Sequence, residues 1–455
     1  MRVHQAYRYA LDPTPEQAAA LASHCGAARV AFNWGLARIK AALNQRAAEQ
    51  SYGVPEELLT EVAWSLYALR RAWNGAKDTA APWWAQNSKE AYNTGLDGVT
   101  RALTNWVASR TGARAGKKVG FPRFKSKHRA TPSCRFTTGT IRVEAGRRQV
   151  TLPRLGTIRT CESTRKLARH LERGTGRIVS ATVRREGGRW FVSFTCEIDR
   201  ADRVPARPDL VVGVDLGVKD LAVLSTGEVV ANPKHHRTAL KRLRRLNKQL
   251  ARRIGPRTPD GGRREPSARW RKTKAALGKT HARVAHQRRD GLHQLTTRLA
   301  STYGTVVVED LNMSGMLANR RLARAIADVG MGEVRRQLTY KTSWNGGRLI
   351  VADRWYPSSK TCSGCGAVKA KLALSERTYT CTGCGLILDR DLNAALNLAA
   401  LAADVAQSCG ETHNARGGAV RPGARARLAP AKRELPPGRT LPRQRGSSPT
   451  LTDKH

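Results

Sequence analysis

Three acidic residues stand where rigid elements are expected to end. Asp215 follows the apolar run 210–214, Glu309 follows the run 306–308, and Asp391 opens an amphipathic segment. Carboxylate oxygens are the ligands that Mg²⁺ and Mn²⁺ prefer, and two such ions about 3.5–4 Å apart can activate water and neutralise a departing oxygen. If the fold brings the three residues together, they form a metal-dependent site for phosphodiester hydrolysis.

Each of these acids also has an ordinary structural interpretation. An acid beside a strand is often a turn former or an ion-pair partner, and Asp391 could cap the helix that it opens. Asp389 is an alternative third ligand that spacing does not exclude. We favour Asp391 as the third ligand.

Four of the nine cysteines form two C-x-x-C pairs with fifteen residues between the pairs, namely Cys362, Cys365, Cys381 and Cys384. Such a spacing can present four thiolates tetrahedrally to Zn²⁺ at about 2.3 Å. Four sulfur ligands leave no open coordination position. The spacing therefore predicts a structural zinc, separate from the hydrolytic site.

The chain carries 81 Lys and Arg against 35 Asp and Glu, a formal net charge of +46. A field of this sign attracts polyanions, and nucleic acid is the natural partner. Two stretches are candidate contact surfaces, although each could also be a solvated charged surface. Basic residues surround Phe121 and Phe124, and residues 234–298 hold 21 Lys or Arg against 3 acids. The candidate contact residues are Lys118, Arg123, Lys125, Lys127, Lys241, Arg244, Arg245 and Lys248.

The sequence has no run of about 18 apolar residues and no basic-then-apolar leader. We therefore expect a bacterial cytoplasmic protein with no membrane partner.

Strands and helices can be anticipated from hydrophobic periodicity. Residues 1–12 alternate between apolar and polar side chains, which predicts a strand. Thr14, Pro15 and Gln17 form a capping-box pattern, which predicts the start of a helical region that extends to about residue 115. Short alternating runs predict an antiparallel sheet or barrel, at 139–144, 148–153, 178–185 and 189–198. Apolar runs with helices between them predict an α/β core, with strands at 210–214, 221–224, 228–230 and 306–308. The Pro-, Gly- and Arg-rich tail 410–455 predicts disorder.

Several motifs resemble the TnpB proteins of insertion sequences, which are related to type V CRISPR effectors. They are the segments 213–217 (GVDLG), 308–312 (VEDLN), 359–366 (SKTCSGCG), 381–385 (CTGCG) and 389–395 (DRDLNAA), with weaker N-terminal signatures at 29–33 and 120–125. The resemblance implies a RuvC-like nuclease of the RNase H fold, with Asp215, Glu309 and Asp391 as metal ligands and a zinc lobe that touches target nucleic acid. It also implies a guide RNA from the transposon end and cleavage of double-stranded target DNA paired to that guide.

The expected fold class is α/β multidomain, and the expected organisation combines the resemblance with the element pattern. We expect a wedge-like β-barrel (1–13 and 116–204), a helical recognition domain (14–115), a RuvC-like nuclease domain (205–355 and 386–408), a zinc ribbon (356–385) and a disordered basic tail (410–455). We expect a monomer. Two other functions need separate tests: a guided DNA-binding regulator that does not cut, and a transposase that acts directly on transposon ends.

Overall fold

The computed structural model describes residues 1–411 apart from 128, 256–257, 259–264 and 374, with side chains described up to residue 403. Met1–Asp404 form one compact unit. The disorder predicted for the tail 410–455 concerns residues that, from 412 onward, lie outside the described part.

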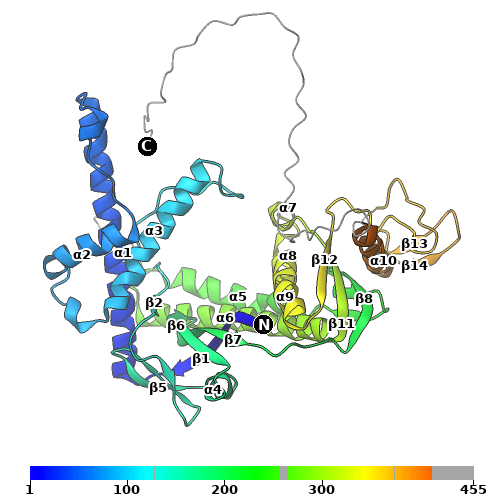
Figure 1. The fold of residues 1–455 in the computed structure, drawn as a ribbon, viewed down its shortest axis with the longest axis horizontal. Coiled ribbons are helices and arrows are strands. Elements are labelled where there is room, and N and C mark those ends of the chain that lie inside the picture. Colours follow the sequence, from blue (N-terminus) through cyan, green and yellow to red (C-terminus); the bar gives the residue numbers. More distant parts are fainter. Residues whose placement is uncertain (128, 256–257, 259–264, 374, 412–455) are drawn as a thin grey trace, which may run out of the picture. The chain divides into compact units, whose positions relative to one another are not determined.

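The N-terminal part begins with strand β1 (Arg2–Asp12) and the long helix α1 (Pro15–Ser51) (Figure 1). The predicted capping box is confirmed, because the Thr14 hydroxyl accepts from the Gln17 N–H at 3.3 Å and the Gln17 side chain accepts from the Thr14 N–H at 3.1 Å. Two further helices follow, α2 (Leu66–Ala80) and α3 (Lys89–Arg110), with short 3₁₀ turns at Glu56–Leu58 and Trp84–Gln86.

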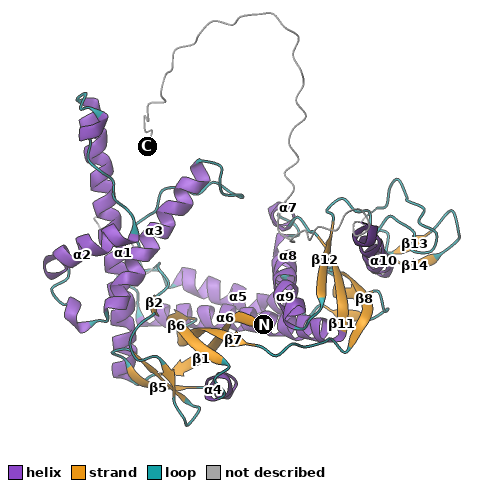
Figure 2. Ribbon diagram, in the orientation of Figure 1, coloured by secondary structure: helices purple, strands orange, loops and turns teal. Residues whose placement is uncertain are grey.

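A seven-stranded antiparallel sheet occupies the next segment, and β1 lies at its centre (Figure 2). Its strands run in the order β2-β6-β7-β1-β5-β4-β3. The bounds are β2 (Ser133–Phe136), β3 (Arg142–Val143), β4 (Gln149–Leu152), β5 (Gly156–Thr160), β6 (Gly176–Glu186) and β7 (Arg189–Asp199), with helix α4 (Arg165–Glu172) after β5. The predicted turn at Gly187 and Gly188 joins β6 to β7, and both residues have positive φ.

The predicted β-barrel is wrong, because β2 and β3 are both edge strands and the described sheet stays open. Helix α3 takes the position where a closing strand would pair with β2. The Thr94 hydroxyl exchanges hydrogen bonds with the backbone of Arg135, and the Glu90 carboxylate accepts from the Thr137 N–H at 3.0 Å. Side chains of helix α3 therefore bond the free backbone groups of β2, which a neighbouring strand would bond in a closed barrel. The sheet and helices α1 to α3 share one hydrophobic cluster, which includes Leu36, Leu96 and Phe194.

The second sheet is mixed and has five strands in the order β10-β9-β8-β11-β12. Strand β8 is antiparallel to β9 and parallel to β11, and β11 is parallel to β12. The bounds are β8 (Arg207–Asp215), β9 (Asp220–Leu224), β10 (Val229–Ala231), β11 (Tyr303–Glu309) and β12 (Arg348–Ala352). The predicted α/β arrangement is confirmed for this sheet, while β12 has no counterpart in the predicted strands.

Helices connect these strands and cover the sheet. Helices α5 (His235–Arg252) and α6 (Ala268–Thr302) lie between β10 and β11, where the sequence predicted a basic-flanked helix; α7 (Met313–Ala318), α8 (Ala323–Val329) and α9 (Met331–Trp344) lie between β11 and β12. Leu299 and Leu338 from two of these helices pack with Val212 and Val308 in one cluster.

The C-terminal part holds a two-stranded ribbon, β13 (Thr378–Thr380) with β14 (Ile387–Asp389), and helix α10 (Arg390–Glu411). Within the described residues, every helix is too short or too polar to cross a membrane.

Candidate functional site

Asp215 and Glu309 end neighbouring parallel strands. Val214 of β8 lies opposite Val308 of β11, so the next residue of each strand, Asp215 and Glu309, emerges at the same edge of the sheet. The residues just before each acid are fully buried, 212–214 in β8 and 306–308 in β11, which fixes these strand ends and the directions in which the two carboxylates leave them. The strand register therefore brings together two of the three predicted acids.

Helix α10 brings the third acid to this edge by packing directly on β8. A Cβ atom at Gly213 would lie 2.0 Å from the Ala395 carbonyl oxygen and 2.6 Å from the Ala399 nitrogen, so only glycine allows this approach. Ala395 is one helical turn beyond Asp391, and residues four apart share a helix face. The face that rests on Gly213 is thus the face that carries Asp391.

The electrostatics of Asp215 show that the acids interact. Burial, together with the negative charges of Glu309 and Asp391, raises the pKa of Asp215 to about 8. The charge of Asp389 raises the pKa of Asp215 by a smaller amount, and the positive charge of Arg390 lowers it. A divalent cation bound among these like charges would remove the repulsion.

Asp389 and Asp391 have different surroundings. The Asp389 carboxylate accepts from the backbone N–H of Asp391 at 2.9 Å and of Leu392 at 3.2 Å, so Asp389 is the residue that caps helix α10. Asp391 makes an ion pair with Arg377 at 3.9 Å and influences Asp215 more strongly than Asp389 does. The capping role that the sequence offered to Asp391 belongs to its neighbour.

The neighbouring acids Glu309 and Asp310 make different contacts. The Ser358 hydroxyl, which is almost fully buried, donates to one Glu309 carboxylate oxygen. The adjacent acid, Asp310, instead contacts two guanidinium groups, those of Arg335 and Arg354, which lower the pKa of its carboxyl group. Glu309 therefore faces the carboxylate cluster, and Asp310 is engaged elsewhere.

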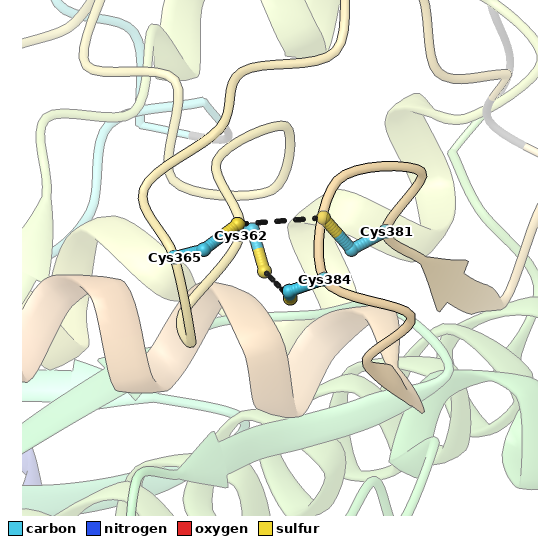
Figure 3. Close-up of side chains that lie close together, drawn as sticks. All are labelled: Cys362, Cys365, Cys381 and Cys384. Carbon is cyan, nitrogen blue, oxygen red and sulfur yellow. Dashed lines mark hydrogen bonds between the residues drawn. The ribbon is translucent and has the colours of Figure 1, made fainter.

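The four predicted zinc ligands converge (Figure 3). Their Sγ atoms all lie within 4.8 Å of one another, and two pairs, Cys362 with Cys384 and Cys365 with Cys381, are 3.6 Å apart. Four sulfurs placed tetrahedrally at about 2.3 Å from a zinc ion would be about 3.8 Å apart. The residues therefore fit a structural zinc of the Cys₄ type.

The two halves of this knuckle have the same backbone design. Gly366 N–H donates to the Cys362 carbonyl at 2.9 Å, and Gly385 N–H donates to the Cys381 carbonyl at 3.1 Å. Both glycines have positive φ, near 75°, which non-glycine residues avoid. Backbone N–H groups of Cys384 and Gly383 lower the pKa of the Cys381 thiol to about 6, which favours the thiolate that binds metal.

Helix α10 also holds the knuckle, through two buried asparagines that the sequence motifs did not single out. The Asn393 side chain donates to the Thr361 carbonyl at 2.7 Å and accepts from the Ser363 N–H at 2.9 Å, which flank Cys362. The Asn397 side chain donates at 2.7 Å to the carbonyls of Ser358 and Thr361. In the sequence, these residues could have been recognised as two asparagines four positions apart in an otherwise apolar helix.

The predicted nucleic-acid residues lie on two separate elements. Lys118, Arg123, Lys125 and Lys127 are exposed in the irregular segment after α3, and Lys241, Arg244, Arg245 and Lys248 are exposed on α5, beside the buried Leu243 and Leu246. Lys125 is the most constrained of the eight. Its ammonium group lies 3.7 Å from the centre of the Phe32 ring, and its backbone is hydrogen-bonded to the Asn33 side chain.

Comparison with protein-family models finds three matches. Residues 193–320 match the OrfB family of IS605-type elements, described as "Probable transposase", residues 332–398 match the Cas12f1-like TNB domain, and residues 1–47 match a helix-turn-helix domain of the OrfB type. In the structure, residues 1–47 are strand β1 and most of the single helix α1.

The chain is also similar to curated proteins named "Putative RNA-guided DNA endonuclease". One from Mycobacterium tuberculosis is 42% identical over 414 residues, covering 87% of this chain and 86% of the relative. A relative from Streptomyces pristinaespiralis is 35% identical and covers 90% of this chain and 92% of the relative. Another from Escherichia coli is 29% identical and covers 90% of this chain and 95% of the relative. A solved Cas12f1–sgRNA–target DNA complex matches 88% of this chain and 99% of the solved chain at 12% identity, with a TM-score of 0.47.

The Mycobacterium tuberculosis relative, 42% identical over most of both chains, shows the family of this chain. The chain belongs to the TnpB family, the OrfB-type proteins of insertion sequences.

Proposed function

We propose that the protein is an RNA-guided DNA endonuclease encoded by an insertion sequence, and that it hydrolyses phosphodiester bonds at a RuvC-like site. The proposal rests on the positions of three acids: Asp215 and Glu309 end neighbouring parallel strands at one edge of the sheet, and Asp391 lies on the helix that packs against Gly213. The sheet order β10-β9-β8-β11-β12 supports it, because three antiparallel strands continue into the parallel strands β11 and β12, and two of the acids end the central strands β8 and β11. The names of the relatives supply the guide and the DNA target.

Asp215, Glu309 and Asp391 would hold Mg²⁺ or Mn²⁺, which when bound supplies charge neutralisation and a more acidic water. The chain's own residues arrange this donor set. Ser358 orients one oxygen of Glu309, Asp389 fixes the first turn of α10, and Gly213 sets the distance between that helix and β8. Sequence choice would come from base pairing with the guide, while the basic surfaces hold the nucleic-acid backbones.

A guided regulator that does not cut is less well supported, because it needs the basic surfaces and not the acidic cluster. All three acids are present and electrostatically coupled. This coupling favours the nuclease.

The test of the proposed function is an Asp215→Asn variant, assayed with the RNA that copurifies with the protein. We expect the loss of cleavage and of Mn²⁺ binding, with RNA copurification unchanged, because the substitution removes a charged ligand and touches neither basic surface. Asp310→Asn is the matched control, since this acid contacts Arg335 and Arg354, and it should keep most of the activity. Full cleavage by Asp215→Asn would refute the assignment.

A second pair of variants decides the third ligand. Asn is as good a helix cap as Asp, so Asp389→Asn should preserve α10 and retain cleavage. Asp391→Asn should abolish cleavage. The opposite result would make Asp389 the ligand.

A further inference from the structure

A basic pocket lies beside the carboxylate cluster, and neither the sequence motifs nor the similar proteins assign it a role. Its volume is about 630 Å³, within the range of about 300–1,000 Å³ typical of ligand pockets. It is formed by the loop after β8, the segment between β10 and α5, the first turn of α5, helix α8 with the residue before it, the residue before β13 and the start of α10. Five cationic residues line it, here called the five-cation pocket: Lys219, Lys234, Arg237, Arg377 and Arg390.

The charge of this pocket is unbalanced. No acidic residue lines it, and among the described residues only two of its cations have ion-pair partners, both at long range. Lys219 is 3.6 Å from Asp220, and Arg377 is 3.9 Å from Asp391. Five like charges around one hollow repel each other, and an anion in the hollow removes that cost.

Two of the cations are held in place by the backbone around them. The Arg390 guanidinium donates through Nη1 to the carbonyls of Ala373 at 3.1 Å and Glu376 at 3.4 Å, while its buried Nε has no hydrogen-bond partner among the described atoms. Lys234 has left-handed backbone angles, φ 48° and ψ 46°, which are unusual for a residue with a side chain.

The end of helix α5 does not itself form the anion site. Asp328 already accepts from the N–H groups of His236 and Arg237, at 2.9 and 3.4 Å, so the exposed donors of that helix end are occupied. Attraction for an anion must therefore come from the side chains of the five cations.

The lining of the pocket combines these cations with one amide and an apolar wall. The amide side chain, Asn232, donates to the Val218 carbonyl at 2.8 Å and accepts from the Lys234 N–H at 3.0 Å, so it is engaged with the protein backbone. The remaining walls are the apolar Val218, Leu322 and Ala325. Lys and Arg side chains that contact phosphates hold a nucleic-acid backbone whatever its sequence.

Two of the cations connect the pocket to the carboxylates. Arg377 pairs with Asp391 at 3.9 Å, and Arg390 directly precedes Asp391 at the start of α10. A strand with one phosphodiester at the carboxylates would therefore place adjoining phosphates against these cations.

We propose that the five-cation pocket binds the backbone phosphates that flank the bond to be cut, on the DNA strand that enters the carboxylate site. The assignment rests on the proposed nuclease function. It makes Lys234 and Arg237 substrate-positioning residues that act on any DNA sequence.

The test uses the full chain with its copurifying RNA and the Asp215→Asn substitution, so that DNA is bound and not cut. Lys234→Gln and Arg237→Gln are introduced singly and together, and binding of single-stranded oligothymidine is measured over a range of salt concentrations. Each lost phosphate contact should reduce the slope of log K against log salt by about 0.7, the value for single strands. Arg348→Gln is the matched control, because Arg348 is exposed at the far end of β12 and has no ion pair in the described part of the chain.

We expect a lower slope for DNA with both pocket variants, an unchanged slope for the control and an unchanged yield of copurified RNA. With Asp215 restored, the pocket variants should raise KM for DNA more than they lower kcat. A reduced RNA yield with unchanged DNA binding would assign the pocket to the guide and overturn the proposal, and unchanged binding of both would exclude a phosphate site. Cleavage that survives Asp215→Asn alone would instead refute the assignment of the carboxylate site, and no cleavage by the unsubstituted protein would refute the nuclease function, whatever the pocket variants do.

Discussion

The zinc knuckle and the carboxylate cluster are both candidate metal sites, yet they are built in opposite ways. The knuckle takes its ligands from residues 362–384, with two tight turns of the same design. The carboxylate cluster takes one candidate ligand from each of β8, β11 and α10, and depends on strand register and on helix packing at Gly213. A site built from nearby residues can survive changes elsewhere, whereas a site built from distant elements fails when any of them shifts.

Helix α10 joins the two sites. One of its faces carries Asp391 and rests on Gly213, and another carries Asn393 and Asn397, which hold the backbone beside Cys362. Ser358, bound by Asn397 through its carbonyl, donates its hydroxyl to Glu309. The knuckle and the cluster are thus connected through hydrogen bonds, and variants directed at each site can separate their contributions.

Zinc removal should have the largest effect. Because the small core of the lobe consists of Cys362, Tyr379 and Cys381 with Leu372 and Leu386, the lobe has little to hold it together without metal. A strong chelator, or Cys381→Ser, should increase hydrogen exchange across residues 358–389 while strands β8 and β11 keep their protection. A protein purified with no zinc and with a rigid lobe would contradict the assignment, and Cys161→Ser, at an exposed cysteine outside the knuckle, is the control.

Gly213→Ala should have the next largest effect, and it should act on the carboxylate cluster. The added Cβ would overlap the Ala395 carbonyl, so the helix must move, at a cost of about 3 kcal/mol or more. Urea denaturation measures the loss, and Mn²⁺ binding should weaken while zinc is retained. Gly75→Ala is the control, because nothing lies within 4 Å of a Cβ there, and it should be neutral or slightly stabilising.

Asn393→Ala tests the connection between the sites. It leaves the Thr361 carbonyl and the Ser363 N–H without their partner, which should cost about 1–3 kcal/mol. Zinc release to a colorimetric chelator should become about tenfold faster or more, as expected when a residue supporting a metal ligand is lost. Asn345→Ala, which removes a 2.8 Å bond to the Lys341 carbonyl away from the knuckle, should leave zinc release unchanged. Equal release rates for the two variants would remove the support role of Asn393.

The pH dependence of the metal-free protein should show the smallest effect, and it concerns Asp215 alone. The pKa of Asp215 is raised in the folded state from its ordinary value of 3.8 to about 8, so the folded protein binds a proton that the unfolded chain releases. This contribution to stability is complete below about pH 4 and is lost as the pH rises through about 8. Thermal melting without divalent cations should show that decline, and Asp215→Asn should reduce it. Added Mg²⁺ should restore stability at pH 8; a flat profile for the metal-free protein would contradict the coupling.

Local features of the structure were predictable from residue types and spacing. The zinc knuckle, the capping box at Thr14 and Gln17, and the turn at Gly187 and Gly188 all form from residues close in sequence. The positions of Asp215 and Glu309 at strand ends were also predictable, because a buried parallel strand is a continuous apolar run. The barrel was not, because the alternation of β2 is the same whether its free edge meets another strand or the side chains of α3.

The sequence by itself determined which residues could bind metal, and that the chain must meet a polyanion, because side-chain chemistry and net charge do not depend on the fold. Only the tertiary structure decided that Asp389 caps helix α10, that Gly213 admits that helix to the sheet, and that five scattered cations line one pocket beside Asp391. These contacts join residues that are distant along the chain. They depend on how whole helices and strands pack together, which local sequence patterns do not determine.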